Sequence, residues 1–232
     1  MNGFLVVDKP GGMTSRDVVN RIQRLLPPRT KIGHTGTLDP LATGVLVLCI
    51  GNATKLADRV QAMGKSYLAR IRLGATSNTD DRDGIVVESP NAIPPTVEVI
   101  LVALPPFVGT ILQTPPDYSA VKVAGRRAHD MARAGKAMDL TARPVTVYRI
   151  DLLNYTWPFL DISVDCGKGT YIRGIARDLG TALGVGGLIE TLRRTKVGPF
   201  AAEQGIGIQV DIEAIRANLI PPSILPDSPP ST

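Results

Sequence analysis

Cysteine and histidine are scarce in this chain of 232 residues, which has two of each. Cys49 and Cys166 lie far apart in apolar segments without metal-ligand spacing, so buried free thiols are expected. With only His34 and His129, a histidine-rich metal site is not expected. No apolar run approaches the roughly 18 residues that span a bilayer, and the N-terminus lacks the basic and apolar regions of a secretory signal. These absences predict a cytoplasmic protein.

Charge and composition describe a basic globular chain. The formal net charge is +5 and the isoelectric point is about 9.4, which favours a polyanionic partner only modestly. Apolar residues make up 44% and charged residues 20%, as in ordinary soluble domains. The length allows one large domain or two small ones, with ample residues to bury a core. No internal repeat is present.

The stretch G-H-T-G-T-L-D-P-L-A-T-G over residues 33–44 has three glycines, a proline and no helical period, which predicts an ordered loop. Leu38 and Leu41 flank Asp39, so its carboxylate is expected to face a partly apolar cavity. The run 45–50 that follows is typical of a buried strand. A carboxylate on a loop anchored by a core strand is well placed for chemistry. The alternative is an Asp-Pro turn in which the side chain caps its own backbone.

Residues 65–74 alternate at period two, which is typical of a half-buried strand. Tyr67 lies on its apolar face, so core packing and a role in a site are both open. Lys9, in the turn that ends the strand at residues 4–7, either holds the fold of the site, faces phosphate or is an ordinary turn lysine. Ser15 is the expected N-cap of a helix that runs to about Leu26.

Two further segments carry charged residues at informative places. The loop 76–84 holds Asp80, Asp81 and Asp83, but it does not fit the EF-hand pattern, and a solvated acidic turn is the alternative. The turn Gly-Lys-Gly-Thr at 167–170 lacks the spacing of a Walker motif and leads into a helix, with Thr170 as the expected N-cap. Arg173 then falls in the first helical turn, where the helix dipole disfavours a cation unless it has an anionic partner. Candidate partners are Asp39, Asp81 and an RNA phosphate.

Several motifs together resemble the TruB family of tRNA pseudouridine synthases. The family pattern G-H-x-G-x-L-D-P-x-A-x-G is met in full at residues 33–44, and D-K-P-x-G-x-[ST]-S at residues 8–15. K-x-Y occurs at 65–67 and K-G-T-Y-[IV]-R at 168–173. The remaining matches are Q-x-P-P-x-[YF]-S-A-x-K at 113–122 and L-R-R-x-x-[VS]-G-x-F at 192–200. The resemblance covers about residues 3–205.

The resemblance implies isomerisation of a specific uridine, at position 55 in the T-loop of tRNA, to pseudouridine, after the nucleotide has been flipped out. Asp39 would be the catalytic nucleophile, Tyr67 would lie against the uracil and Arg173 would pair with Asp39. Asp81 would pair with that arginine, and Leu192 would line the uracil pocket. The other implied RNA-binding residues are His34, Lys9, Tyr118, Lys122, Lys168 and Arg193. Six basic residues at 126–149 would clasp the T-loop, although a solvated basic surface is the alternative. Arg194, next to Arg193, would also hold an RNA phosphate.

The implied fold is α+β, a largely antiparallel mixed central sheet with flanking helices and a central RNA-binding cleft. Residues 1–205 would form the catalytic domain, and residues 206–232 a short helix and proline-rich tail without the C-terminal PUA domain of typical bacterial members. The reaction demands no cofactor and no metal, and a monomer that binds the tRNA T-stem-loop is expected. The alternatives are a non-catalytic tRNA-binding or tRNA-folding protein, and a pseudouridine synthase that acts on another RNA.

Overall fold

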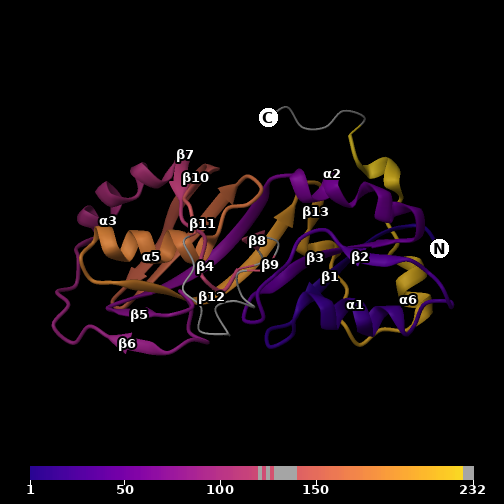
Figure 1. Cartoon of the computed structure of the whole chain (residues 1–232), viewed down its shortest axis with the longest axis horizontal. Helices are drawn as coiled ribbons and strands as arrows, with labels where there is room; N and C mark the ends of the chain where they lie inside the picture. Colours follow the sequence, from indigo (N-terminus) through magenta and orange to yellow (C-terminus); the bar gives the residue numbers. More distant parts are fainter. Residues whose placement is uncertain (120–121, 124–125, 128–139, 227–232) are drawn as a thin grey trace. The chain divides into compact units, whose positions relative to one another are not determined.

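The computed structural model describes residues 1–119, 122–123, 126–127 and 140–226, and Figure 1 shows its helices and strands. The chain forms two compact units. Unit 1 consists of Met1–Tyr67 and Leu192–Thr232, and unit 2 of Leu68–Thr191. Strands β4 (Lys65–Leu73) and β12 (Gly187–Val197) each run from one unit into the other. The fold of unit 1 thus joins two segments that the whole of unit 2 separates in sequence.

Unit 1 is built on a strongly apolar pair of strands. β1 (Gly3–Lys9) runs antiparallel to β3 (Thr43–Ile50) along its whole length. β2 (Ile32–His34) also pairs antiparallel with β3, whereas β12 joins β3 in parallel at Arg193 and Arg194. All of the residues 44–50 are buried. Burial of side chains on both faces of β3 explains why its sequence is a continuous apolar run rather than an alternating one.

Short helices and a second hairpin complete unit 1. β13 (Phe200–Ala201) folds back antiparallel on β12. The Phe4 and Phe200 rings meet edge to face in the core, with centroids 5.2 Å apart. The helical segments of this unit are α1 (Ser15–Gln23), η1 (Gly51–Leu56), α2 (Ala57–Ala62), η3 (Ala202–Gln204), α6 (Ile212–Ala217) and η4 (Pro222–Ile224).

Unit 2 contains a sheet in which β4, β11, β10 and β7 follow one another. β10 (Arg143–Thr156) pairs antiparallel with β11 (Phe159–Cys166) on one side and with β7 (Gly109–Gln113) on the other. Two small hairpins join β5 to β6 and β8 to β9. The remaining elements of this unit are β5 (Ala75–Ser77), β6 (Val86–Glu88), α3 (Val97–Ala103), η2 (Pro105–Phe107), β8 (Lys122–Val123), β9 (Arg126–Arg127) and α5 (Ile172–Ala182).

The predicted α+β class is confirmed, with mostly antiparallel strands and the parallel β12–β3 pairing as its mixed element. The period-two pattern of β4 is confirmed as well, because Tyr67, Ala69 and Ile71 are buried whereas Leu68 and Arg70 are exposed. The RNA-binding cleft and the domain boundary at residue 205 stay predictions.

Two predicted N-caps are wrong by one residue each. Ser15 lies one residue after the observed cap of α1, and Thr170 lies one residue before that of α5. The N-cap of α1 is Thr14, whose hydroxyl accepts from the Asp17 N–H while the Asp17 carboxylate accepts from the Thr14 N–H. Ser15 is instead the first helical residue, and α1 ends at Gln23, short of the predicted Leu26. The N-cap of α5 is Tyr171, while the Thr170 hydroxyl donates to the Gly167 carbonyl. Neighbouring Ser and Thr residues are equally good caps by type, so tertiary contacts decide between them.

Gly180, near the end of α5, is required by close backbone packing. A Cβ at this position would lie 2.2 Å from the Gly187 nitrogen and 2.3 Å from the Gly186 carbonyl carbon. We expect Gly180→Ala to lower the free energy of unfolding by about 1–3 kcal/mol through overpacking, although alanine favours helix. Urea denaturation measures the change.

Gly207→Ala is the matched control, because nothing lies within 4 Å of the added methyl. It should change stability by no more than about 0.5 kcal/mol. A Gly180→Ala variant as stable as the wild type would contradict the packing argument.

Candidate active site

Ser15 fixes the backbone of the loop 33–44 next to Asp39. Its buried hydroxyl accepts from the Leu38 N–H at 2.8 Å and donates to the Leu38 carbonyl at 3.1 Å. At the other side of the loop the Ala42 N–H donates to the Asp39 carbonyl, which closes a turn over Pro40. Leu38 is buried, whereas Asp39 is partly exposed. The backbone on both sides of Asp39 is therefore held, while the residue itself is partly exposed.

Lys9 is a fully buried cation that ties the turn after β1 to the loop 33–44. Its Nζ donates to the carbonyls of Pro10 at 2.8 Å, Met13 at 2.7 Å and Pro40 at 3.2 Å. These three acceptors match the three donors of an ammonium group. Burial lowers the pKa of Lys9 to about 8, while the Asp39 carboxylate raises it. Of the roles predicted for Lys9, this geometry favours holding the site over binding a phosphate.

Arg194 anchors the same loop from β12. The side chain is buried, and its guanidinium donates to the carbonyls of Val45 at 2.8 Å, Gly36 at 3.2 Å and Thr37 at 3.4 Å. Gly44 permits the close backbone pairing of β3 with β12 here, because a Cβ there would lie 2.1 Å from the Arg194 carbonyl oxygen. The resemblance implied a phosphate ligand for Arg194, whereas in the structure its buried guanidinium is occupied by these three carbonyls. No pattern in the sequence around Arg194 reveals these partners.

The other predicted residues of unit 1 differ in exposure. Tyr67 in β4 and Leu192 in β12 are buried. His34, at the end of β2, is partly buried, and its Nδ1 lies 3.4 Å from the Gly36 nitrogen, from which it accepts. Arg193 forms a two-point ion pair with Asp8, at 2.9 and 3.0 Å, and is more than a third exposed. Arg193 can therefore still meet a phosphate.

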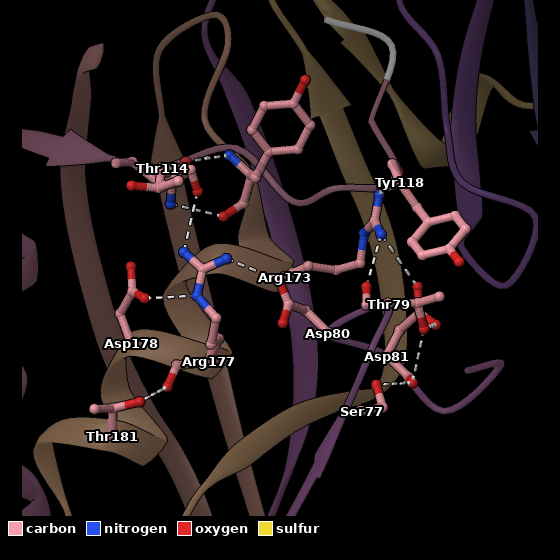
Figure 2. Close-up of polar contacts among 12 residues, drawn as sticks. Ser77, Thr79, Asp80, Asp81, Thr114, Tyr118, Arg173, Arg177, Asp178 and Thr181 are labelled. Atoms are coloured by element: carbon pink, nitrogen blue, oxygen red, sulfur yellow. Dashed lines mark hydrogen bonds and ion pairs between the residues drawn. The ribbon is translucent and has the colours of Figure 1, made fainter. Parts of the chain in front are cut away.

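In unit 2, Arg173 lies in the first turn of α5, as predicted, and its side chain reaches two loops (Figure 2). Its Nη1 donates to the Thr79 carbonyl at 2.8 Å, and its Nη2 donates to the Tyr118 carbonyl at 2.9 Å. The Asp81 carboxylate lies 3.5 Å from Nη1. Both side chains of this ion pair are buried. The predicted pairing of Asp81 with the arginine is thus seen, whereas pairing of Arg173 with Asp39 stays a prediction.

Asp81 is fixed from within its own loop. Its carboxylate accepts from the Thr79 hydroxyl at 2.6 Å and from the Asp83 N–H at 3.1 Å. The backbone of this segment is held too, because Asp81 forms an isolated parallel β-bridge with Ile189. A solvated acidic turn does not describe this carboxylate, which is 4% exposed.

The remaining predicted residues of unit 2 lie around the start of α5. Tyr118 is partly exposed and contributes its carbonyl to Arg173, and Lys168 is exposed in the turn before the helix. Gln113 and Tyr171 exchange two hydrogen bonds, of 2.9 and 2.8 Å, that join β7 to the helix start. Lys122 lies in β8, and its side chain, like most of the basic window 126–149, lies outside the described residues.

Cys49 and Cys166 are buried free thiols, as predicted. Burial raises the pKa of Cys49 to about 12, so this thiol is unreactive near neutral pH. In the part of the chain that the structure describes, no helix is long and apolar enough to cross a membrane.

Two family models match consecutive parts of the chain. Residues 23–172 match the TruB family pseudouridylate synthase (N terminal domain), and residues 173–217 match the tRNA pseudouridylate synthase B C-terminal domain. The first match alone covers more than half of the chain and defines its class, the pseudouridine synthases. Within that class, the chain belongs to the TruB family.

Curated relatives agree with this assignment. The tRNA pseudouridine synthase B of Corynebacterium efficiens is 50% identical over 209 residues, which cover 88% of this chain and 70% of that protein. The enzyme of the same name from Paenarthrobacter aurescens is 43% identical over 98% of this chain and 76% of that protein. The tRNA pseudouridine synthase B of Mycobacterium tuberculosis is 49% identical over 87% of this chain and 69% of that protein.

Solved structures share the fold. A crystal structure of a Cbf5-Nop10-Gar1 complex matches with a TM-score of 0.68 and 32% identity over 88% of this chain and 52% of that one. The structure of an H/ACA RNP bound to a substrate RNA containing 2′-deoxyuridine matches with a TM-score of 0.65 and 30% identity, over 89% of this chain and 51% of that one. The chain spans about half the length of these structural relatives.

The buried ammonium of Lys9 predicts a pH dependence of stability. Its pKa is about 8 in the folded protein, against 10.5 for an exposed lysine, so between these values the unfolded chain binds more protons at this position. The free energy of unfolding of the wild type should therefore rise across this interval relative to Lys9→Met, by roughly 3 kcal/mol at most.

Denaturant titrations of both proteins at pH 7.5, 9 and 10.5 measure this difference. Subtracting the variant removes the contributions of tyrosines and other lysines that titrate in the same range. If the free energy of unfolding of the wild type minus that of Lys9→Met stays constant or falls as the pH rises, the lowered pKa of Lys9 is contradicted.

Proposed function

We propose that this chain converts one specific uridine of tRNA, at position 55 in the T-loop, to pseudouridine, with Asp39 as the catalytic nucleophile. The observation that carries the proposal is the state of Asp39. Its loop has the full family motif, the backbone of that loop is held by Ser15, Lys9 and Arg194, and Asp39 itself is partly exposed. Support also comes from relatives named tRNA pseudouridine synthase B.

The reaction is an isomerisation. The N1–C1′ glycosidic bond breaks, the uracil turns, and a C5–C1′ bond forms, after which the C5 proton leaves to solvent and N1 takes up a proton. The Asp39 carboxylate attacks either C1′ or C6 and is released when the new bond is complete, so it is regenerated in each turnover. Atoms and charge balance without an oxidant, a reductant or a second substrate.

The other residues act around the flipped nucleotide. A uridine in a folded T-loop is first extruded, at a cost of a few kcal/mol. Tyr67 lies against the uracil and Leu192 lines its pocket, while His34 braces the space that the base leaves. Arg173, oriented by Thr79 and Asp81, supplies the positive charge that balances the Asp39 carboxylate.

Contacts with the rest of the T-stem-loop come from exposed basic and aromatic residues. Arg193 and Lys168 are accessible to phosphates, Tyr118 is partly exposed beside Arg173, and Lys122 follows on the same segment. Such contacts predict tRNA affinity that falls as the salt concentration rises. The protein acts as a monomer in the cytoplasm.

Asp39→Asn tests the proposal, because it removes the nucleophile and keeps the size of the side chain. With a full tRNA transcript we expect at least about a 10³-fold loss of kcat, the scale for loss of a catalytic nucleophile. Binding to the same tRNA should remain like that of the wild type. Pseudouridine mapping at single-nucleotide resolution and filter binding measure the two quantities.

Asp58→Asn is the matched control, since Asp58 is a carboxylate on α2 of the same unit and away from the loop 33–44 in sequence. It should leave conversion and binding unchanged. If wild type and Asp39→Asn bind tRNA equally and neither forms pseudouridine, the chain is a tRNA-binding protein. Conversion of a uridine outside the T-loop, or of a uridine only in another RNA, would show that the proposed substrate is wrong.

A further inference from the structure

Arg177 lies one helical turn after Arg173 on α5 and contacts the same two loops (Figure 2). Its Nη1 donates to the Asp80 carboxylate at 2.9 Å, and its Nη2 donates to the Thr114 carbonyl at 3.0 Å. Its Nε donates to the Asp178 carboxylate at 2.8 Å. All three nitrogens of the guanidinium are thus used. Neither the motifs nor the composition of the chain predicted a role for this residue.

Asp80 is the partner that makes Arg177 necessary. Its side chain is only 14% exposed, and its φ of +59° places the backbone in the left-handed region. The Asp80 N–H donates to the Ser77 carbonyl, and its own carbonyl accepts from the Ile189 N–H. The backbone of Asp80 is therefore held on both sides, which fixes where its largely buried carboxylate starts.

The charge of Asp80 acts on the site through Arg173. Burial raises the pKa of Asp80, whereas Arg177 and Arg173 lower it and Asp178 raises it. Arg173 is therefore the second cation within electrostatic reach of this carboxylate. Its guanidinium is committed to Thr79 and Asp81, the two chain neighbours of Asp80. Without Arg177, the largely buried charge of Asp80 would draw Arg173 away from these partners.

We propose that Arg177 is a positioning residue for the isomerisation: it neutralises Asp80 and holds Thr114, so that the guanidinium of Arg173 stays on Thr79, Asp81 and Tyr118. The effect on the reaction rests on the proposed function, in which Arg173 faces the reacting groups. Arg177 itself touches no substrate in this account. Its removal should therefore lower kcat and leave the KM for tRNA nearly unchanged.

Charge rescue separates this role from that of a simple structural clamp. Arg177→Met removes the positive charge and keeps an unbranched side chain of similar reach. Asp80→Asn removes the negative charge, and asparagine tolerates the left-handed backbone at this position. If the uncompensated Asp80 charge is the cause of the defect, the double variant recovers. If the defect comes only from the lost bond to Thr114, the double variant stays as slow as Arg177→Met.

The experiment measures kcat and KM on full tRNA for the wild type, both single variants and the double variant. We expect Arg177→Met to lose about tenfold in kcat, within the range of coupled neighbours, and the double variant to return to within about threefold of the wild type. Arg70→Gln, which breaks another arginine–aspartate pair of unit 2, is the control and should keep wild-type kcat.

A double variant as slow as Arg177→Met, an Arg177→Met variant as fast as the wild type, or a defect confined to KM would each overturn the proposal. Hydrogen exchange at the Asp80 and Arg82 amides, which donate to Ser77 and Ile189, supplies a readout without turnover. Exchange should be faster in Arg177→Met and normal in the double variant. If the wild type forms no pseudouridine, the proposed function fails, and this exchange pattern alone decides the role of Arg177.

Discussion

Buried cations that donate to backbone carbonyls hold the two irregular regions of this protein in place. A loop without helix or sheet pairing leaves carbonyls unsatisfied, and each unsatisfied buried carbonyl costs about 1–3 kcal/mol. Lys9 and Arg194 each satisfy three carbonyls in unit 1, and Arg173 satisfies two in unit 2. Lysine and arginine suit this task because they carry several donors and no acceptor. The positions of Asp39 and Asp81 depend on these bonds.

This arrangement reconciles two demands on the carboxylate that we propose as the nucleophile. Asp39 needs a fixed position, yet it must remain accessible to a nucleotide that enters from solvent. The buried ammonium of Lys9 and guanidinium of Arg194 bind backbone carbonyls of the loop, so they restrain it while Asp39 stays partly exposed. In unit 2 the same principle applies to Arg173, with Arg177 balancing a nearby carboxylate that would compete for it. Catalytic geometry here is a property of loops and their anchors more than of the sheet.

The sequence predicted the parts of this picture that depend on local pattern. β3 and β4 follow from an apolar run and from period-two alternation, and the family motif singles out Asp39, Tyr67 and Arg173. Two of the anchors, Ser15 and Arg194, escaped prediction because their partners are distant in sequence: Ser15 bonds to Leu38, and Arg194 bonds to Gly36. Residue type alone interpreted Ser15 as a helix cap and Arg194 as a phosphate ligand. Burial, which only the fold reveals, reversed both interpretations.

The most direct test of the account is release of tritium from tRNA labelled at C5 of its uridines. Formation of the C5–C1′ bond detaches the C5 hydrogen, so each pseudouridine releases one label to water. With the purified chain we predict release that ends at one equivalent per tRNA molecule. No release above a protein-free control, under conditions in which the tRNA is bound, would contradict the assignment of this chain as a uridine isomerase.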